Sequence, residues 1–178
     1  LGFSQLLEME VLSEAHQKYV QEIKNAGFHL LALIDEILDL AKIEAGHIDL
    51  RPELVDVSAL VQECIALVKN QAGKMNITIH HAGLSGLVLQ ADRIRFKQIL
   101  LNLMSNAIKY NSKQGKAEVT CIENTPGRVR ISIENSGAGL HPEQMAQLFQ
   151  PFNRLGQDSG SEEGTGIGLV LSKQLVEL

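Results

Sequence analysis

Residues 102–110 read NLMSNAIKY and lie in the amphipathic segment that begins after Asp92. Asn102, Asn106 and Lys109 are spaced by four and three residues, so a helix would place two amides and one ammonium on one face. Amide oxygens can hold Mg²⁺ without adding charge, and a lysine can reach phosphate. The same residue types are common on solvated helix faces, so this stretch alone leaves both interpretations open.

Two glycine-rich segments follow along the chain. Residues 137–139 (GAG) come directly after a predicted strand ending at Glu134, where glycines allow a flat ring or a phosphate to approach the backbone. A plain turn would explain them equally well. Residues 164–168 (GTGIG) open the last predicted helix, whose first N–H groups can bind phosphate oxygens. They form neither a P-loop, because no Gly-Lys-Ser/Thr follows, nor a Rossmann turn, because no strand precedes them. The loop over 153–163 is predicted to be a mobile lid.

Around these motifs the chain alternates helices with pairs of strands. Strands are predicted over 47–57 (an edge strand, since it contains Pro52), 76–81, 87–90, 117–123 and 128–134, the last two joined by a turn at 124–127. Helices are predicted from Ser58 to about Ala72, from Asp92 past Ile108, briefly after Pro142 and from near Gly166. Antiparallel strand pairs alternating with helices predict an α+β fold, a two-layer α/β sandwich.

The first part of the chain has a different pattern. Apolar residues recur at 19, 23, 26, 30, 33, 37 and 40, and a second stripe runs beside them at 27, 31, 34, 38 and 41. Ser13 offers an N-cap and Gly46 a C-cap, which bounds a helix of about 30 residues. Two adjacent stripes need two neighbouring helices, so we expect a bundle completed by a second subunit. The alternative is a long helix packing on its own chain.

Charge and cysteine content narrow the function classes. The formal net charge of −5 lies entirely in residues 1–51, which hold nine acidic and four basic residues, and it argues against nucleic acid as the main partner. Cys64 and Cys121 are far apart with no Cys-X-X-Cys spacing, so they are predicted to be small buried side chains and not zinc ligands. The longest uncharged stretch, 75–91, contains polar residues and glycines, so it is not a membrane span.

In this order and spacing, the motifs resemble the ATP-binding domain of sensor histidine kinases of two-component systems. The matching segments are the N box at 102–110, the first glycine box ENSGAGL at 134–140, the Phe box LFQPFNRLG at 148–156 and the second glycine box GTGIGLVLSKQLVEL at 164–178. HLLALIDEILDLAKIEAG at 29–46 is similar to the second helix of the family's dimerisation and phosphotransfer hairpin. The resemblance implies a helical dimerisation segment over 1–50 and a Bergerat-type ATP-binding domain over 51–178.

The resemblance also implies a cofactor and a set of site residues. Asn106 would ligand the Mg²⁺ that bridges the ATP phosphates, Lys109 would contact phosphate, and Tyr110 would lie near the ribose and phosphate. The other nucleotide-binding residues that it implies are Asn102, Asn135, Gly137, Gly139, Leu140, Phe152, Gly164, Thr165, Gly166, Ile167, Gly168 and Leu169. Of these, Gly137 and Gly139 would line the adenine pocket, while Phe149 and Phe152 would anchor the lid.

Two positions bear on the chemistry that the resemblance implies. Related ATPases of the gyrase, Hsp90 and MutL types carry a general-base glutamate one turn before the magnesium ligand, where this chain has Asn102, which favours phosphotransfer to a protein over hydrolysis. Asn135 stands where the family usually has an aspartate that accepts a hydrogen bond from the adenine amino group. An amide accepts without charge assistance, so about 1 kcal/mol, or about fivefold in affinity, would be lost. Because an amide also donates, discrimination against guanine would weaken.

The family's phosphoacceptor histidine has no counterpart in this sequence. It would lie upstream of Leu1, about ten residues before the segment resembled by LGFSQLL, and the histidines at 16, 29, 47, 80, 81 and 141 sit in no such motif. Further strands that the family places after the last helix are absent as well. We therefore expect this chain to bind Mg-ATP without phosphorylating itself, while the kinase core passes the γ-phosphate to the upstream histidine and then to an aspartate of a response regulator.

Several alternatives stay open at this level. A degenerate kinase acting as a dimeric signalling module with weak or no nucleotide binding is the main alternative, and an ATPase of the chaperone or topoisomerase type is disfavoured by Asn102 and the heptad helix. The expected partners are a second copy and a response-regulator receiver domain, with no nucleic acid or membrane contact by this cytoplasmic segment.

Overall fold

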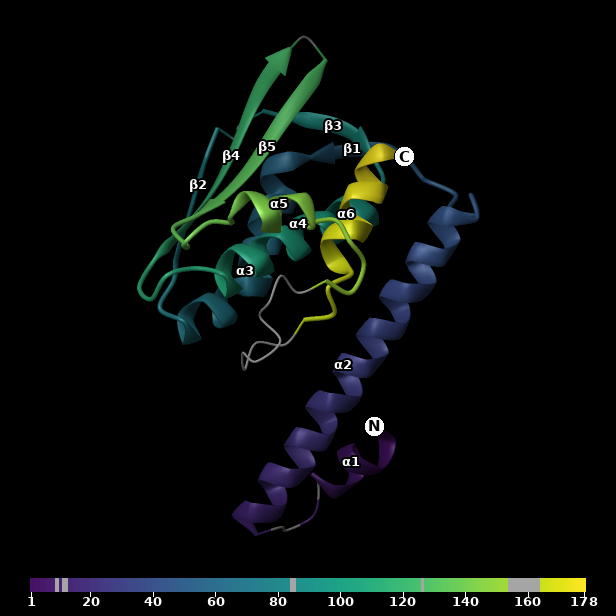
Figure 1. The fold of residues 1–178 in the computed structure, drawn as a ribbon, viewed down its shortest axis with the longest axis vertical. Coiled ribbons are helices and arrows are strands. Elements are labelled where there is room, and N and C mark those ends of the chain that lie inside the picture. Colours follow the sequence, from purple (N-terminus) through teal and green to yellow (C-terminus); the bar gives the residue numbers. More distant parts are fainter. Residues whose placement is uncertain (9, 11–12, 84–85, 126, 154–163) are drawn as a thin grey trace. The chain divides into compact units, whose positions relative to one another are not determined.

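The computed structural model describes residues 1–178 except 9, 11–12, 84–85, 126 and 154–163 (Figure 1). The chain divides into two compact units, which we call the N-terminal unit (Leu1–His47) and the C-terminal unit (Ile48–Leu178).

The N-terminal unit consists of α1 (Gly2–Leu7) and α2 (Glu14–Glu44). The side chain of Ser13 accepts a hydrogen bond from the His16 N–H at the start of α2. At its end Gly46 adopts a φ of +67°, the His47 N–H donates to the Lys42 carbonyl at 2.8 Å, and the Gly46 N–H donates to the carbonyl of Ile43 at 2.9 Å. This is a Schellman motif, so both predicted caps are confirmed.

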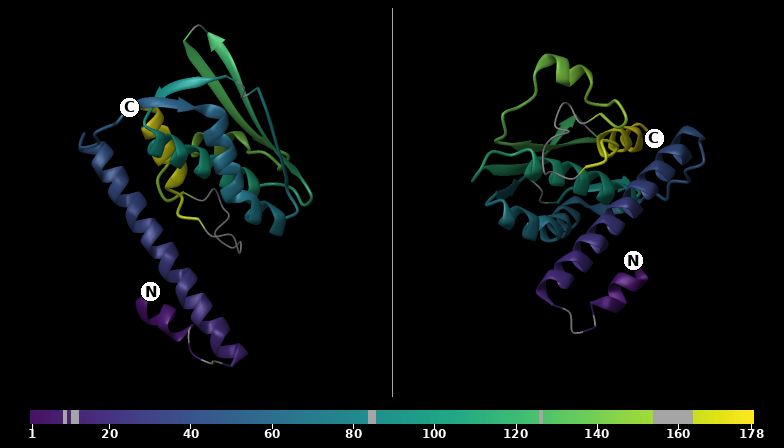
Figure 2. Two further views of the ribbon diagram at one scale, coloured as in Figure 1. Left: turned by 180° about the vertical axis from the view of Figure 1, so that it is seen from behind. Right: turned by 60° about the horizontal axis from the view of Figure 1, so that its bottom comes forward.

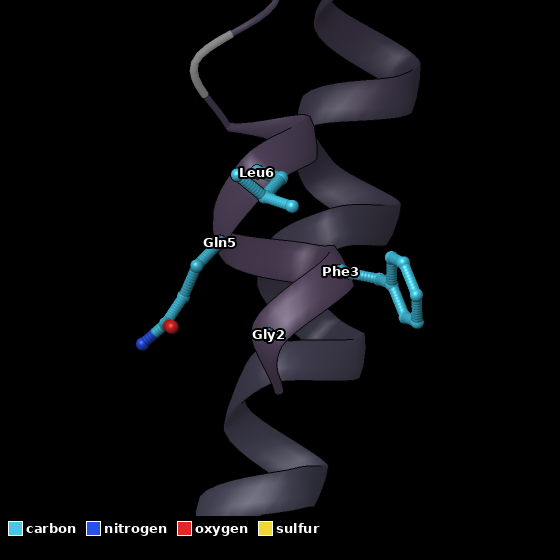
Figure 3. Close-up of a pocket in the computed structure, with 4 residues that line it drawn as sticks. All are labelled: Gly2, Phe3, Gln5 and Leu6. Carbon is cyan, nitrogen blue, oxygen red and sulfur yellow. The ribbon is translucent and has the colours of Figure 1, made fainter.

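The helix α1 lies beside the N-terminal half of α2 (Figure 2). Lys24 and Glu8 form an ion pair at 2.6 Å, and the Leu1 side chain lies so close to Gly27 that a Cβ there would come within 2.8 Å of it. A pocket on α1 is lined by Gly2, Phe3, Gln5 and Leu6, of which Phe3 projects away from the ribbon (Figure 3). This small contact covers little of α2, in which Val20 alone is buried.

In the described part of the C-terminal unit, five strands form two sheets. The strand β1 (Glu53–Asp56) pairs with β3 (Val88–Ala91) in an antiparallel ribbon. The second sheet has the order β2–β4–β5, comprising β2 (Thr78–Ala82), β4 (Lys116–Thr125) and β5 (Arg128–Asn135). The pair β4–β5 is the predicted antiparallel hairpin, but β2 runs parallel to β4. The expectation of antiparallel pairs alone was therefore wrong, because the long connection through β3 and a helix between β2 and β4 allows a parallel pair.

The helices α3 (Val57–Lys74), α4 (Arg93–Lys109) and α6 (Gly168–Glu177) form a second layer, in which α4 lies between α3 and α6 (Figure 1). The short helix α5 (Pro142–Ala146) has no buried residue. The helices α3 and α4 and the strand β4 all contribute fully buried side chains to the core. These are Leu60, Val61 and Cys64 of α3, Leu100 and Ile108 of α4, and Val119 and Cys121 of β4. The predicted two-layer α/β architecture is confirmed.

Four predicted boundaries differ from the structure. The N-cap of α3 is Asp56 and not Ser58, because the Asp56 carboxylate accepts from the Ala59 N–H at 3.0 Å. The predicted strand over 47–57 is a strand only over Glu53–Asp56, since β3 offers four partners and Pro52 has no N–H to donate. The strand β4 extends into the predicted turn as far as Thr125, and the last helix begins two residues later than predicted, at Gly168.

The two cysteines are free thiols in the core, 0% and 2% exposed, as predicted. Burial raises the pKa of the Cys64 thiol to about 11, and it also raises the pKa of Cys121. Within the part of the chain that the structure describes, no three histidine, cysteine or carboxylate side chains are grouped to hold a metal ion. None of the helices there is long and apolar enough to cross a membrane.

Candidate nucleotide-binding site

The helix α4 carries the first group of candidate residues, and its N-terminus is held by Asp92. The Asp92 carboxylate accepts hydrogen bonds from the N–H groups of Arg51 at 3.0 Å, Ile94 at 3.0 Å and Arg95 at 3.1 Å. These bonds, that of Arg51 first, lower the pKa of Asp92, because they stabilise the charged form. The cap fixes where the helix starts and therefore which face carries the N box.

Asn102 joins α4 to α6. Its Nδ2 donates to Oγ of Ser172 at 2.7 Å, and its Oδ1 accepts from Nδ2 of Asn106 at 3.5 Å. The same oxygen lies against Gly168, where a Cβ would collide with it. Since Ser172 is 7% exposed, this contact is part of the packing between the two helices.

The second glycine box begins beside Lys109, at the C-terminal end of the α4 face that carries Asn102 and Asn106. A Cβ on Gly164 would come within 2.7 Å of Nζ of Lys109. Gly166 has a φ of +73°, and its carbonyl accepts from the N–H of Phe152 at 3.2 Å. A Cβ on Gly166 would meet the Phe152 backbone at 2.9 Å, so both conformation and space require glycine there.

The first glycine box is attached to the C-terminal end of α4. Asn135 donates from Nδ2 to the carbonyl oxygen of Tyr110 at 2.9 Å. A Cβ on Gly137 would collide with the same carbonyl. Nζ of Lys109 lies 4.8 Å from the centre of the Tyr110 ring. The three motifs identified in the sequence are therefore adjacent along one helix.

A hydrogen-bonded cluster that sequence reasoning missed supports this junction. Nδ2 of Asn111 donates to the carbonyls of Ala107 and Lys116, both at 3.0 Å, while its Oδ1 accepts from the Ser112 N–H and from Oγ of Ser136, both at 2.9 Å. Oγ of Ser136 also accepts from the Lys116 N–H at 2.9 Å. The cluster joins α4, β4 and β5, and its only signal in the sequence is that its members adjoin the motif residues.

Other predicted residues take different positions. Gly139, Leu140 and Phe152 are exposed, and Gly139 has open space around it, so its φ of +75° explains the glycine there. Ile167 is fully buried, and its N–H donates to Oγ1 of Thr165 at 3.2 Å.

The remaining residues of this region lie at its edge. Leu169 is partly buried. Nζ of Lys173 lies 5.1 Å from the centre of the Phe149 ring. Most of the predicted lid and the end of the Phe box lie outside the described residues.

The donor set near Asn106 fits a magnesium-bound phosphate group. Nδ2 of Asn106 is directed to Asn102, while no described residue donates to its Oδ1. Mg²⁺ prefers oxygen ligands, keeps several waters and is commonly held by one or two protein groups together with phosphate oxygens. The amide oxygen of Asn106, with the ammonium of Lys109 one turn further along the helix, matches that requirement.

Known proteins match this chain over nearly its whole length, both in sequence and in structure. Residues 1–46 match the His Kinase A (phospho-acceptor) domain, and residues 91–178 match the histidine kinase-, DNA gyrase B-, and HSP90-like ATPase family. The cell-division control histidine kinase PdhS of Brucella suis is 32% identical over 99% of this chain and 18% of its own length.

Two solved structures extend this comparison. Full-length ShkA in complex with AMPPNP has a TM-score of 0.84 at 32% identity, covering 99% of this chain and 37% of ShkA. The histidine kinase ThkA in complex with the response regulator TrrA has a TM-score of 0.63 at 29% identity, covering 89% of this chain and 47% of the other. The chain spans about a fifth of the length of the curated relatives it matches. With a helical segment that matches the His Kinase A family, followed by an α/β domain that matches the ATPase family, the chain belongs to the sensor histidine kinase family.

Proposed function

We propose that this chain is the dimerisation and nucleotide-binding core of a protein-histidine kinase. It binds Mg-ATP along α4, and the γ-phosphate passes to a histidine outside this sequence and then to an aspartate of a response regulator. The observation that carries this proposal is the junction of both glycine boxes with the face and C-terminal end of α4, where the amide oxygen of Asn106 accepts from none of the described residues.

The residues divide the work of holding the nucleotide. Asn106 would ligand the metal through Oδ1, and Lys109 would contact phosphate oxygens beside Gly164. The first N–H groups of α6, which begins at Gly168, would add partial positive charge. Bound Mg²⁺ supplies neutralisation of phosphate charge. Gly137 and Gly139 would form the wall against the adenine ring.

The chemistry at Asn102 favours transfer over hydrolysis. Both ends of its amide are engaged, one with Ser172 and the other with Asn106. An amide cannot take a proton from water at neutral pH, so this position provides no general base. The phosphoryl group is therefore passed to a side chain of the protein and not to an activated water.

The exposed apolar face of α2 supports a second copy as partner. Leu30, Leu31, Ile34 and Leu38 are 44–58% exposed in the single chain, although they follow the two predicted stripes. A receiver domain of a response regulator is the second partner, as the ThkA–TrrA complex suggests. Phosphorylation of this chain alone is not expected, because none of its six histidines lies in a motif typical of the phosphoacceptor.

Calorimetric titration with ATP, in Mg²⁺ and in EDTA, tests the proposal. The chain should bind ATP more tightly in Mg²⁺. Asn106→Ala should remove most of that enhancement, by about tenfold, and Lys109→Ala should weaken binding in both conditions by about tenfold. The matched controls are Asn70→Ala and Lys69→Ala on the exposed face of α3, which should change neither value.

One result would favour the degenerate signalling module. If ATP at millimolar concentration gives no heat of binding and causes no shift in thermal unfolding, the chain does not bind nucleotide. Retention of dimerisation in that case would leave association through α2 as its remaining function.

A further inference from the structure

We propose that Ser172 is a positioning residue that orients the metal-binding amide of Asn106 through Asn102. This inference rests on the proposed function, since it assumes that Asn106 ligands the metal. It adds a role for α6 beyond phosphate binding by its first N–H groups.

The reason lies in the two unlike ends of an amide. A metal ion binds the carbonyl oxygen, whereas the NH₂ end carries partial positive charge and repels a cation. The two ends have nearly the same shape, so a ligand asparagine needs a neighbour that holds its nitrogen. Groups of this kind behind a metal ligand fix its orientation, and their loss typically weakens metal binding by about 10–100-fold.

The structure provides such a neighbour for Asn106 in two steps. Oγ of Ser172 accepts from Nδ2 of Asn102 at 2.7 Å, which leaves Oδ1 of Asn102 as the end that faces Asn106. That oxygen accepts from Nδ2 of Asn106 at 3.5 Å, so the Asn106 nitrogen is turned toward Asn102 and its oxygen away from it. Without the hydroxyl, nothing in this chain of bonds selects the orientation of Asn102.

Burial and space strengthen the restraint on Asn102. Ser172 is 7% exposed, so water competes weakly for its hydroxyl. Gly168, one turn earlier on α6, leaves room for Oδ1 of Asn102, where a Cβ would collide with that atom. The helix α6 thus provides both the acceptor that orients Asn102 and the gap that it occupies.

The test compares the ATP dissociation constants in EDTA and in Mg²⁺, whose ratio measures the metal contribution. Ser172→Ala should lower this ratio by about tenfold while changing the value in EDTA by less than about twofold. Ser172→Thr keeps the hydroxyl and should retain most of the ratio. Gly168→Ala should displace Asn102 and lower the ratio as Ser172→Ala does.

A matched control lies on the other side of α4. Oγ of Ser105 accepts from Nε2 of Gln71 of α3 at 3.4 Å, so Ser105→Ala also removes a partly buried hydroxyl between two helices. It should leave the ratio unchanged. The side-chain NH₂ resonances of Asn106 in the nucleotide-free protein provide a second readout, and they should shift in Ser172→Ala but not in Ser105→Ala.

The outcomes separate this inference from the proposed function. A wild-type chain without any Mg²⁺ enhancement overturns both. A wild-type chain with the enhancement, together with a folded Ser172→Ala variant that keeps it, overturns only the role of Ser172. Equal losses in Mg²⁺ and EDTA also overturn it, because they indicate a purely structural hydroxyl. If Ser172→Ala does not fold, the same decision rests on Ser172→Cys, because a thiol is a much weaker hydrogen-bond acceptor than a hydroxyl.

Discussion

The two units of the chain differ in how far they bury their apolar side chains. In α2, a helix of 31 residues, Val20 alone is buried, and large side chains such as Tyr19 and Ile23 are more than 60% exposed. In the C-terminal unit the helices α3 and α4 bury Leu60, Leu100 and Ile108 almost completely against the sheet.

This difference means that the C-terminal unit is stabilised within a single chain, whereas the stability of the N-terminal unit depends on association. Burying a leucine or isoleucine side chain contributes about 1.5–3 kcal/mol, and the C-terminal unit obtains this contribution within one chain. The N-terminal unit obtains it only when another helix pair covers α2, so its stability should depend on protein concentration. The two units should therefore unfold in separate, differently controlled steps.

The largest expected effect is on association through α2. Leu30→Asp should weaken dimerisation by at least about 100-fold, because it places an unpaired carboxylate in an apolar interface. Sedimentation equilibrium measures the dimer constant, and thermal unfolding of the C-terminal unit should stay unchanged. Ala32→Asp, an exposed position outside both stripes, is the matched control and should dimerise normally.

A Leu30→Asp variant that still dimerises with wild-type affinity would contradict this prediction. The exposed stripes of α2 would then not be the surface that joins two copies. The contrast between the two units would have to be explained by a different partner.

Local signals predicted the ends of α2 correctly, whereas strand pairing depended on distant residues. Ser13 and Gly46 act on N–H and carbonyl groups within a few residues of themselves, so their cap roles are visible in a short window. The parallel pairing of His80 with Glu118 joins residues on strands separated by β3 and α4. A short strand has the same alternating pattern whichever partner it finds, so sequence alone did not determine its direction.

The same distinction applies to the candidate site. Helical spacing placed Asn102 and Asn106 on one face of α4, and their hydrogen bond agrees with that spacing. The bond between Asn102 and Ser172 joins residues separated by 70 positions, and that between Asn111 and Ser136 joins residues 25 apart. Such contacts follow from how helices and strands pack, which residue spacing does not specify.

An intermediate effect is expected at the Asp92 cap, inside the C-terminal unit. Asp92→Ala should lower the free energy of unfolding by about 1–2 kcal/mol at pH 7, independently of protein concentration. Because the folded pKa of Asp92 lies below its usual value, the stabilisation is fully present above the unfolded pKa of about 3.9 and is lost as pH falls through the folded pKa. Urea unfolding at several pH values measures this difference.

The cap of α3 provides the control for Asp92. The Asp56 carboxylate accepts one N–H, that of Ala59, whereas Asp92 accepts three. Asp56→Ala should therefore cost less than Asp92→Ala. Equal costs, or an Asp92→Ala difference that persists unchanged in acid below the folded pKa, would show that the extra hydrogen bonds of Asp92 do not stabilise the fold.

The smallest expected effect is at Asn135, where stability and nucleotide affinity should move in opposite directions. Asn135→Asp removes the donor to the Tyr110 carbonyl and turns a carboxylate oxygen toward that oxygen, which should destabilise the C-terminal unit by about 0.5–1 kcal/mol. If Asn135 contacts the adenine amino group, the charged acceptor should raise ATP affinity by about fivefold and lower the affinity for GTP. Urea unfolding and nucleotide titration separate the two effects, with the exposed Asn70→Asp as control.

An Asn135→Asp variant of unchanged stability would mean that the hydrogen bond to the Tyr110 carbonyl contributes nothing to stability. Unchanged affinities would place the base away from Asn135, and the amide would then act only to attach the first glycine box to α4.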